Sequence, residues 1–178
     1  MTDAVSGEKN INRDDFRLGT LDDELRVDGL CRELLMEFYN RQLADGLDPE
    51  TASMLAGSAD YFIRDFVVSI MGRNIFCETP GLVRQFAGNW YIVSTLEPNG
   101  AELVGHLEGI RAFYRYLRDR DLISAGYLER VEAECDAFGY YEGRIDSFWK
   151  ITADGYLAWE RECSLKDDNS APTGHNSP

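Results

Sequence analysis

Apolar residues recur along this chain at the spacing that places them on one face of an α-helix. The first such stripe predicts a helix that begins near Asp22 or Asp28, runs to Ala44 and is ended by Gly46. Its apolar positions lie three to five residues apart and are Leu30, Leu34, Leu35, Phe38 and Leu43. The same period continues through most of the chain, so the pattern predicts a mainly α fold.

The second helix has a clear start signal in Asp48-Pro49-Glu50. Asp48 can cap the free N–H groups, Pro49 fits the first helical position, and Glu50 favours the positive end of the helix dipole. Its apolar stripe runs to Met71, after which Gly72 ends the helix. The stripe consists of Met54 or Leu55, Ala59, Phe62, Ile63, Phe66, Val67 and Ile70.

Two further helices follow the same rules. Thr79-Pro80 predicts the start of a third helix, and Pro98-Asn99-Gly100 breaks the chain after it. A fourth helix then runs to Asp119 or Arg120. The apolar positions of the third helix are Leu82, Val83, Phe86, Trp90 and Val93, and those of the fourth are Leu103, Leu107, Ile110, Phe113, Tyr114 and Leu117.

The pattern is less regular after Leu122. Ser124 is a candidate cap for a fifth helix that ends near Phe138, before Gly139. Residues 148–160 place Asp154-Gly155 between two short aromatic and β-branched runs, which favours a β-hairpin over a helix. The whole pattern predicts a flexible N-terminus over residues 1–21, a single helical domain over 22–165 and a disordered tail over 166–178.

Two motifs resemble parts of a known domain. Gly46-Leu-Asp-Pro-Glu-Thr51, followed by Tyr61-Phe62 and Phe66, is similar to the start of the N-terminal core-binding (SAM-like) domain of phage integrases and other tyrosine recombinases. Leu107-Glu-Gly-Ile-Arg-Ala-Phe-Tyr-Arg-Tyr-Leu117, followed by Asp121-Leu-Ile123, resembles the last helix of that domain. The resemblance covers about residues 30–123 and leaves 124–165 as a C-terminal extension. The resemblance implies a four- to five-helix bundle of the kind that binds DNA.

The catalytic half of that family has no counterpart in this sequence. Tyrosine recombinases place a tyrosine nucleophile and an Arg/His-x-x-Arg cluster in a second, C-terminal domain. Here only about 55 residues follow Ile123, and His106 lies in His-Leu-Glu-Gly rather than His-x-x-Arg. The other histidine, His175, belongs to the predicted tail. The resemblance therefore implies binding without catalysis, and we expect no cofactor.

The net charge limits the classes of partner. The chain carries 32 acidic against 18 basic residues, a formal charge of −14. This excess disfavours non-specific coating of DNA, because counterion release needs surplus lysine and arginine. Residues 48–123 account for only −3 of the total, so a local arginine surface in the integrase-like part stays compatible with the composition.

Cysteine spacing and hydropathy bear on the compartment. Cys31, Cys77, Cys135 and Cys163 lie far apart with no C-x-x-C pair, which predicts buried free thiols rather than a zinc site. Residues 1–15 hold no apolar stretch of signal-peptide length, and no window approaches the roughly 18 apolar residues of a bilayer span. We expect a cytoplasmic protein that does not enter a membrane.

The main nucleic-acid candidate is an arginine stripe on the fourth helix. Arg111, Arg115 and Arg118 lie at i, i+4 and i+7, beside the apolar face. They either contact phosphates, as the resemblance suggests, or form intrahelical pairs such as Glu108 with Arg111 and Arg115 with Asp119. The intrahelical pairs are favoured by the negative total charge. Further candidates for DNA contact are Arg64, Arg73 and Arg84.

Acidic residues crowd the predicted fifth helix without a metal-binding spacing. They are Glu129, Glu132, Glu134 and Asp136. No Ca²⁺-binding loop or Glu-x-x-His pair accompanies them, so a solvated acidic face is the simpler interpretation. His106 has no nucleophile beside it in the sequence and is interpreted as a partly exposed helix histidine.

Trp149, Tyr156 and Trp159 lie outside the recognised helices. They either fasten the C-terminal segment to the bundle or form an exposed patch for a partner. The sequence as a whole favours a non-catalytic interaction module that binds a protein partner. The alternative is an accessory protein that contacts duplex DNA. The identity of the partner and the possible formation of a homo-oligomer stay open.

Overall fold

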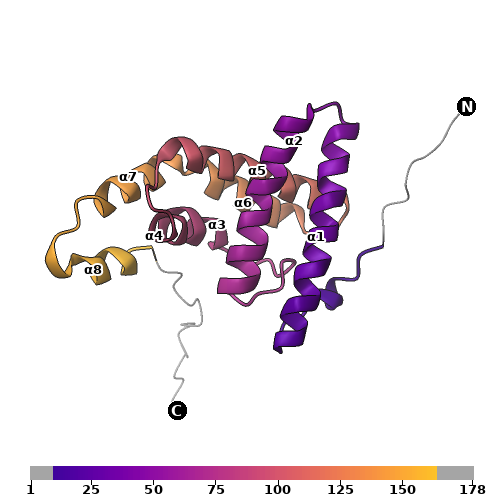
Figure 1. Ribbon diagram of the computed structural model, residues 1–178, viewed down its shortest axis with the longest axis horizontal. Coiled ribbons are helices and arrows are strands. Elements are labelled where there is room, and N and C mark those ends of the chain that lie inside the picture. Colours follow the sequence, from indigo (N-terminus) through magenta and orange to yellow (C-terminus); the bar gives the residue numbers. More distant parts are fainter. Residues whose placement is uncertain (1–9, 164–178) are drawn as a thin grey trace, which may run out of the picture.

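The computed structural model describes residues 10–163, whose regular secondary structure is entirely helical (Figure 1), and the mainly α prediction is confirmed. The longest helices are α1 (Leu21–Ala44) and α5 (Gly100–Asp119). The other α-helices are α2 (Pro49–Asp60), α3 (Leu82–Gln85), α4 (Tyr91–Ser94), α6 (Ala125–Asp136), α7 (Phe138–Phe148) and α8 (Tyr156–Arg161). Two π-helical segments, η2 (Tyr61–Ile70) and η3 (Phe86–Trp90), and two 3-10 turns, η1 (Arg13–Phe16) and η4 (Ala153–Gly155), complete the set. Within the described range, none of these helices is long and apolar enough to span a bilayer.

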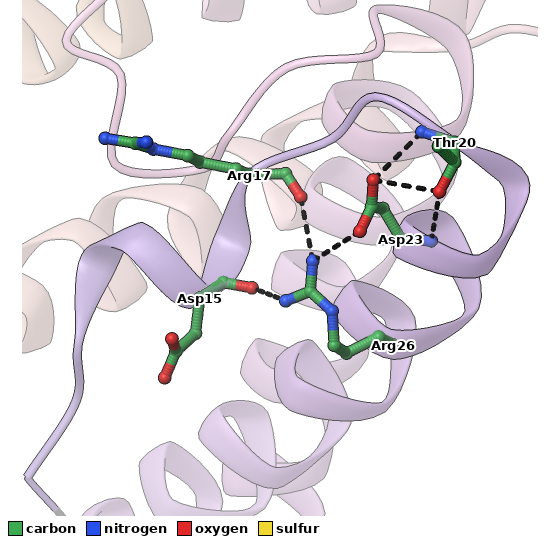
Figure 2. A network of polar contacts seen from close by, with 5 residues as sticks. All are labelled: Asp15, Arg17, Thr20, Asp23 and Arg26. Carbon is green, nitrogen blue, oxygen red and sulfur yellow. Dashed lines mark hydrogen bonds and ion pairs between the residues drawn. The ribbon is translucent and has the colours of Figure 1, made fainter.

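A polar network fastens the segment before α1 to the start of that helix (Figure 2). The Thr20 hydroxyl accepts the Asp23 N–H at 3.2 Å, and the Asp23 carboxylate accepts the Thr20 N–H at 3.0 Å, which together form a capping box. The Arg26 guanidinium donates to the Asp23 carboxylate and to the backbone carbonyls of Asp15 and Arg17. Hydrogen bonds from Arg26 and Thr20 lower the pKa of Asp23.

This network lies partly in the segment that was expected to be flexible, residues 1–21. Residues 13–16 form the turn η1, and Phe16 is buried edge-on against Phe76 with ring centroids 4.8 Å apart. Apolar burial and the contacts of Arg26 therefore fix this part of the N-terminal segment. Residues 1–9 and the predicted tail over 166–178 lie outside the described residues.

The helices α2 and η2 form one continuous rod beside α1 (Figure 1). The Asp48 carboxylate accepts the N–H groups of Glu50 and Thr51 at 3.1 and 3.0 Å, and Pro49 is the first helical residue. The predicted start and length of this helix are therefore confirmed. From Tyr61 onward the rod has π-helical hydrogen bonding, which the apolar pattern did not indicate.

The third helix begins later than Thr79-Pro80 predicts. Helix α3 starts at Leu82 after Gly81, whose φ of 82° lies in the left-handed region that suits glycine. The free N–H groups of Gly81 and Arg84 are bound by the Glu134 carboxylate, at 2.7 and 3.0 Å. A carboxylate from α6 thus supplies the cap that the local sequence was expected to supply. Helices α3, η3 and α4 then follow one another from Leu82 to Ser94.

Helix α5 packs closely against α2 at Gly109. A Cβ atom on Gly109 would clash with Ser58 and would lie 2.7 Å from the carbonyl oxygen of Leu55. Only glycine permits this approach, because the contacted atoms belong to a helix backbone and to a Cβ atom that cannot rotate away. The crossing places Phe113 and Tyr114 of α5 in the core, where both are fully buried.

The C-terminal extension is helical, so the β-hairpin prediction is wrong. Ser124 caps α6, as predicted, but a further helix α7 follows, and η4 and α8 occupy the segment expected to pair as strands. The Gly155 N–H bonds to the Thr152 carbonyl at 3.2 Å within a 3-10 turn. Helix α8 places Trp159 in the core, and this tertiary burial outweighs the local preference for strands.

The close crossing of α2 and α5 predicts opposite effects for two glycines of the same helix. Gly109→Ala is expected to lower the free energy of unfolding by about 1–3 kcal/mol, because the methyl group overpacks the interface. A methyl group at Gly105 would lie in open space. Gly105→Ala is therefore expected to raise the free energy of unfolding by up to about 1 kcal/mol, because alanine has the higher helix propensity. Urea denaturation followed by circular dichroism measures both. Equal effects of the two substitutions would contradict the packing described.

Candidate functional site

The arginine stripe of α5 is neutralised within the protein. Arg111 forms an ion pair with Asp136, and the Arg115 Nε donates to Glu132 at 2.6 Å. Arg118 pairs with Asp121 at 2.6 Å, just after the end of α5. Two of the three arginines thus pair with acidic residues of α6, namely Asp136 and Glu132. Exposed pairs of this kind contribute about 0–1 kcal/mol each, but a phosphate ligand would have to displace them.

The remaining candidate arginines lie on other elements. The Arg64 guanidinium of η2 bonds to Asp28 at 2.7 Å and to Asp60 at 2.8 Å. The Arg84 guanidinium lies 4.5 Å from the centroid of the Tyr140 ring. Arg73 is exposed in the connection between η2 and α3, without an ion-pair partner among residues 10–163. Two of these three are thus held by internal contacts, as the arginines of the stripe are.

A polar cleft of about 260 Å³ lies between the C-terminal turns of α1 and α5. The Arg120 side chain, nearly buried, donates to Glu37 at 2.6 Å and to the Tyr116 hydroxyl at 2.7 Å. Arg41 pairs with Asp45 at 3.1 Å. No pattern in the sequence indicates this cleft, because its two walls are about 70–80 residues apart in the chain. The carboxylates that accompany its guanidinium groups leave the cleft close to neutral, so it carries no strong anion-binding field.

The three aromatic candidates of the C-terminal extension separate into one anchor and two surface residues. Trp159 is 5% exposed, whereas Trp149 is 58% and Tyr156 38% exposed. Leu157, which follows Tyr156 in α8, is 59% exposed. We refer to Trp149, Tyr156 and Leu157 as the α7–α8 patch. Trp159 therefore fastens α8 to the core, whereas Trp149 and Tyr156 are exposed.

Ring contacts through Phe148 and Trp159 link the two aromatic residues of the α7–α8 patch. Trp149 contacts Phe148 with centroids 5.8 Å apart, and Phe148 contacts Trp159 at 5.2 Å. Tyr156 stacks on Trp159 at 6.1 Å with an angle of 29° between the rings. The exposed rings are thus the two ends of a chain of four aromatic side chains. Helices α7 and α8 form one end of the molecule, far from α1 (Figure 1).

A buried arginine supports the patch from beneath. Arg144 is 4% exposed, and its guanidinium carbon lies 3.8 Å from the centroid of the Trp159 ring. Its Nε donates to the Gly88 carbonyl at 2.9 Å, and Nη1 donates to Glu162 at 3.1 Å. The Trp159 indole N–H lies 3.2 Å from the Arg144 carbonyl. These contacts fix α8 against α7 and η3, so the patch rests on an ordered surface.

The histidine and most of the cysteines of residues 10–163 are buried or partly buried. His106 lies against the Tyr61 ring, 5.0 Å between centroids, and burial lowers the pKa of His106, which favours the neutral imidazole. Burial raises the pKa of Cys31 and Cys135 to about 12, so both thiols stay protonated near neutral pH. Cys77 is exposed, which corrects its expected burial. Within residues 10–163, no group of three or more His, Cys, Asp or Glu side chains is placed to hold a metal ion.

The support of the patch by Arg144 predicts local opening when that side chain is replaced. Arg144→Met removes the cation–π contact and leaves the Gly88 carbonyl without its donor, at a combined cost of about 2 kcal/mol. Amide hydrogen exchange over α8 is expected to accelerate about 30-fold. Arg161→Met, on the exposed side of α8, serves as the control. Equal exchange rates in the two variants would show that Arg144 does not fix α8.

Comparison with known proteins leaves the side chains as the basis for inferring function. No protein-family model, curated protein or solved structure matches this chain. The likeness of residues 30–123 to an integrase core-binding domain therefore stays a prediction from the two motifs. The function must be inferred from the exposure, charge and support of the surfaces described above.

Proposed function

We propose that this protein is a non-catalytic helical interaction module that binds a protein partner through the α7–α8 patch. The observation that carries the proposal is the exposure of Trp149, Tyr156 and Leu157 on an ordered support. Large apolar side chains gathered on one surface mark interaction sites more often than isolated ones do. Tryptophan and tyrosine are also the side chains most enriched among residues that dominate binding energy.

The support of the patch lowers the cost of binding. A side chain that is ordered only on association loses about 0.5–1.5 kcal/mol of conformational freedom. Tyr156 already stacks on the buried Trp159, and Trp149 already contacts Phe148. These two aromatic side chains therefore have less freedom to lose than unsupported surface residues, and more of the energy of burial remains as affinity.

Binding of duplex DNA through Arg111, Arg115 and Arg118 is the alternative, and the resemblance to an integrase core-binding domain is what suggests it. Each of these arginines already has a carboxylate partner. Phosphates would have to replace those carboxylates while approaching a chain of net charge −14. The electrostatic cost makes the protein partner the better supported of the two.

Affinity purification from cells that contain the protein tests the proposal. Trp149→Ser with Leu157→Ser removes the patch, and Met54→Ser with Leu96→Ser, at apolar positions 59% and 96% exposed, is the matched control. The wild type and the control are expected to retain the same proteins. The patch variant is expected to retain at least 30-fold less of them, because truncation of anchor residues costs about 2 kcal/mol or more of binding free energy. Quantitative mass spectrometry measures the loss.

Two results would contradict the proposal. One is an identical set of retained proteins for all three forms. The other is binding of a labelled duplex by the wild type at about 50 mM salt that is lost from a variant with Arg111, Arg115 and Arg118 each replaced by Gln. Circular dichroism of each variant establishes that it is folded before its binding is compared.

A further inference from the structure

Three acidic side chains lie on the elements that carry the α7–α8 patch. Asp146 is exposed on α7, three residues before Trp149 and therefore on the same side of the helix. Asp154 is exposed in η4, and a Glu160 carboxylate oxygen accepts from the Tyr156 hydroxyl at 3.4 Å. Lys150 is exposed next to Trp149, and Glu162 pairs with the Arg144 guanidinium. Residues 144–162 together carry four acidic and three basic residues, a formal charge of −1. The apolar patch therefore lies in a negative local field, within a protein whose total charge is also negative.

This charge distribution selects among the surfaces that could cover the patch. Two copies that met through their patches would bring two identical acidic rims together, which disfavours self-association through this face. An anionic lipid surface would be repelled in the same way. A partner segment with positive charges beside its apolar residues is attracted by the rim and buries the exposed rings. Cationic side chains can also stack on the Trp149 indole.

The size and setting of the patch limit the form of that segment. Aromatic side chains bury about 150–250 Å² each when fully covered, so two partly exposed rings and one leucine offer only a few hundred Å². That area suits a single short element rather than a domain face of about 800 Å². Within residues 10–163 no strand offers an edge for β-strand addition. An amphipathic helix, which presents apolar anchors at i, i+3 or i+4, and i+7, fits such a surface.

We propose that the α7–α8 patch binds a cationic amphipathic helix of a partner protein, with apolar residues on the rings and lysine or arginine residues against the acidic rim. This inference rests on the proposed function of the patch. The positive charge of the partner segment is the new element, and it follows from Asp146, Asp154 and Glu160 near the exposed rings.

Fluorescence anisotropy with three labelled peptides of about 18 residues tests the inference. The first peptide is a helix of leucine and lysine with the leucines on one face, the second carries glutamate in place of lysine, and the third is a scrambled leucine–lysine sequence. The first is expected to bind the wild type with a low-micromolar Kd at about 50 mM salt and to weaken as salt is added. The other two are expected to bind at least tenfold more weakly.

Matched variants separate the rim from the total charge. Asp146→Lys with Asp154→Lys reverses the rim, whereas Glu50→Lys with Glu129→Lys makes the same change in net charge at exposed residues on α2 and α6. The rim variant is expected to weaken the first peptide at least fivefold and the distant variant less than twofold. The patch variant, with Trp149→Ser and Leu157→Ser, is expected to weaken it at least tenfold.

The outcomes distinguish the partner chemistry from the patch itself. Equal effects of the rim and distant variants would overturn the inference, and so would binding of the glutamate peptide as tight as that of the lysine peptide. Neither result would contradict the proposed function, which the affinity purification tests separately. Binding of the first peptide that does not change in the patch variant would also overturn it, because the peptide would then occupy another acidic surface. Failure of the first peptide to bind would overturn it as well.

Discussion

The close approach of α2 and α5 at Gly109 determines how these two helices pack. Because no side chain separates the two helices there, α5 lies against the α2–η2 rod and buries Phe113 and Tyr114. This placement also fixes the direction of the other faces of α5. Arg111 and Arg115 then meet the acidic side of α6, so the packing of one glycine determines which charges become neighbours.

Part of the acidic excess of this protein serves to hold its own helices together. Several acidic residues have structural partners: Glu132 and Asp136 pair with arginines of α5, and Glu134 caps α3 through two backbone N–H groups. These contacts occupy the most basic stripe of the sequence. The α7–α8 patch is an exposed apolar surface that the buried Arg144 supports, and it is the surface that we propose for a protein ligand.

Local signals predicted the parts of this fold that depend on local interactions. Asp48 and Ser124 cap their helices as expected, because an N-terminal cap needs only the side chain and the next three residues. The start of α3 was missed because its cap, Glu134, is about 50 residues away in sequence. The hairpin was wrong for a related reason. Trp159 packs in the core against Arg144 and Phe148. Local propensity does not determine these tertiary contacts.

The candidate site was predicted in the same partial way. Of the three aromatic candidates, Trp149 and Tyr156 are exposed and Trp159 is buried. The sequence pattern does not point to Leu157, which is also exposed. The arginine stripe was correctly placed on one helix, and one of the two open alternatives was internal pairing. The pairs proposed then, Glu108 with Arg111 and Arg115 with Asp119, were not the pairs that form. Burial and pairing across helices depend on tertiary geometry, which spacing along one helix does not determine.

We propose the α7–α8 patch, and not the arginine stripe, as the surface that partners contact. A photo-crosslinking amino acid placed at Leu157, at Leu96 or at Arg118 tests this through the covalent adducts formed in cells. We expect discrete protein adducts from Leu157, none of the same mass from Leu96, and no nucleic-acid adduct from Arg118. Adducts to nucleic acid from Arg118, or the same protein adducts from Leu157 and Leu96, would contradict it.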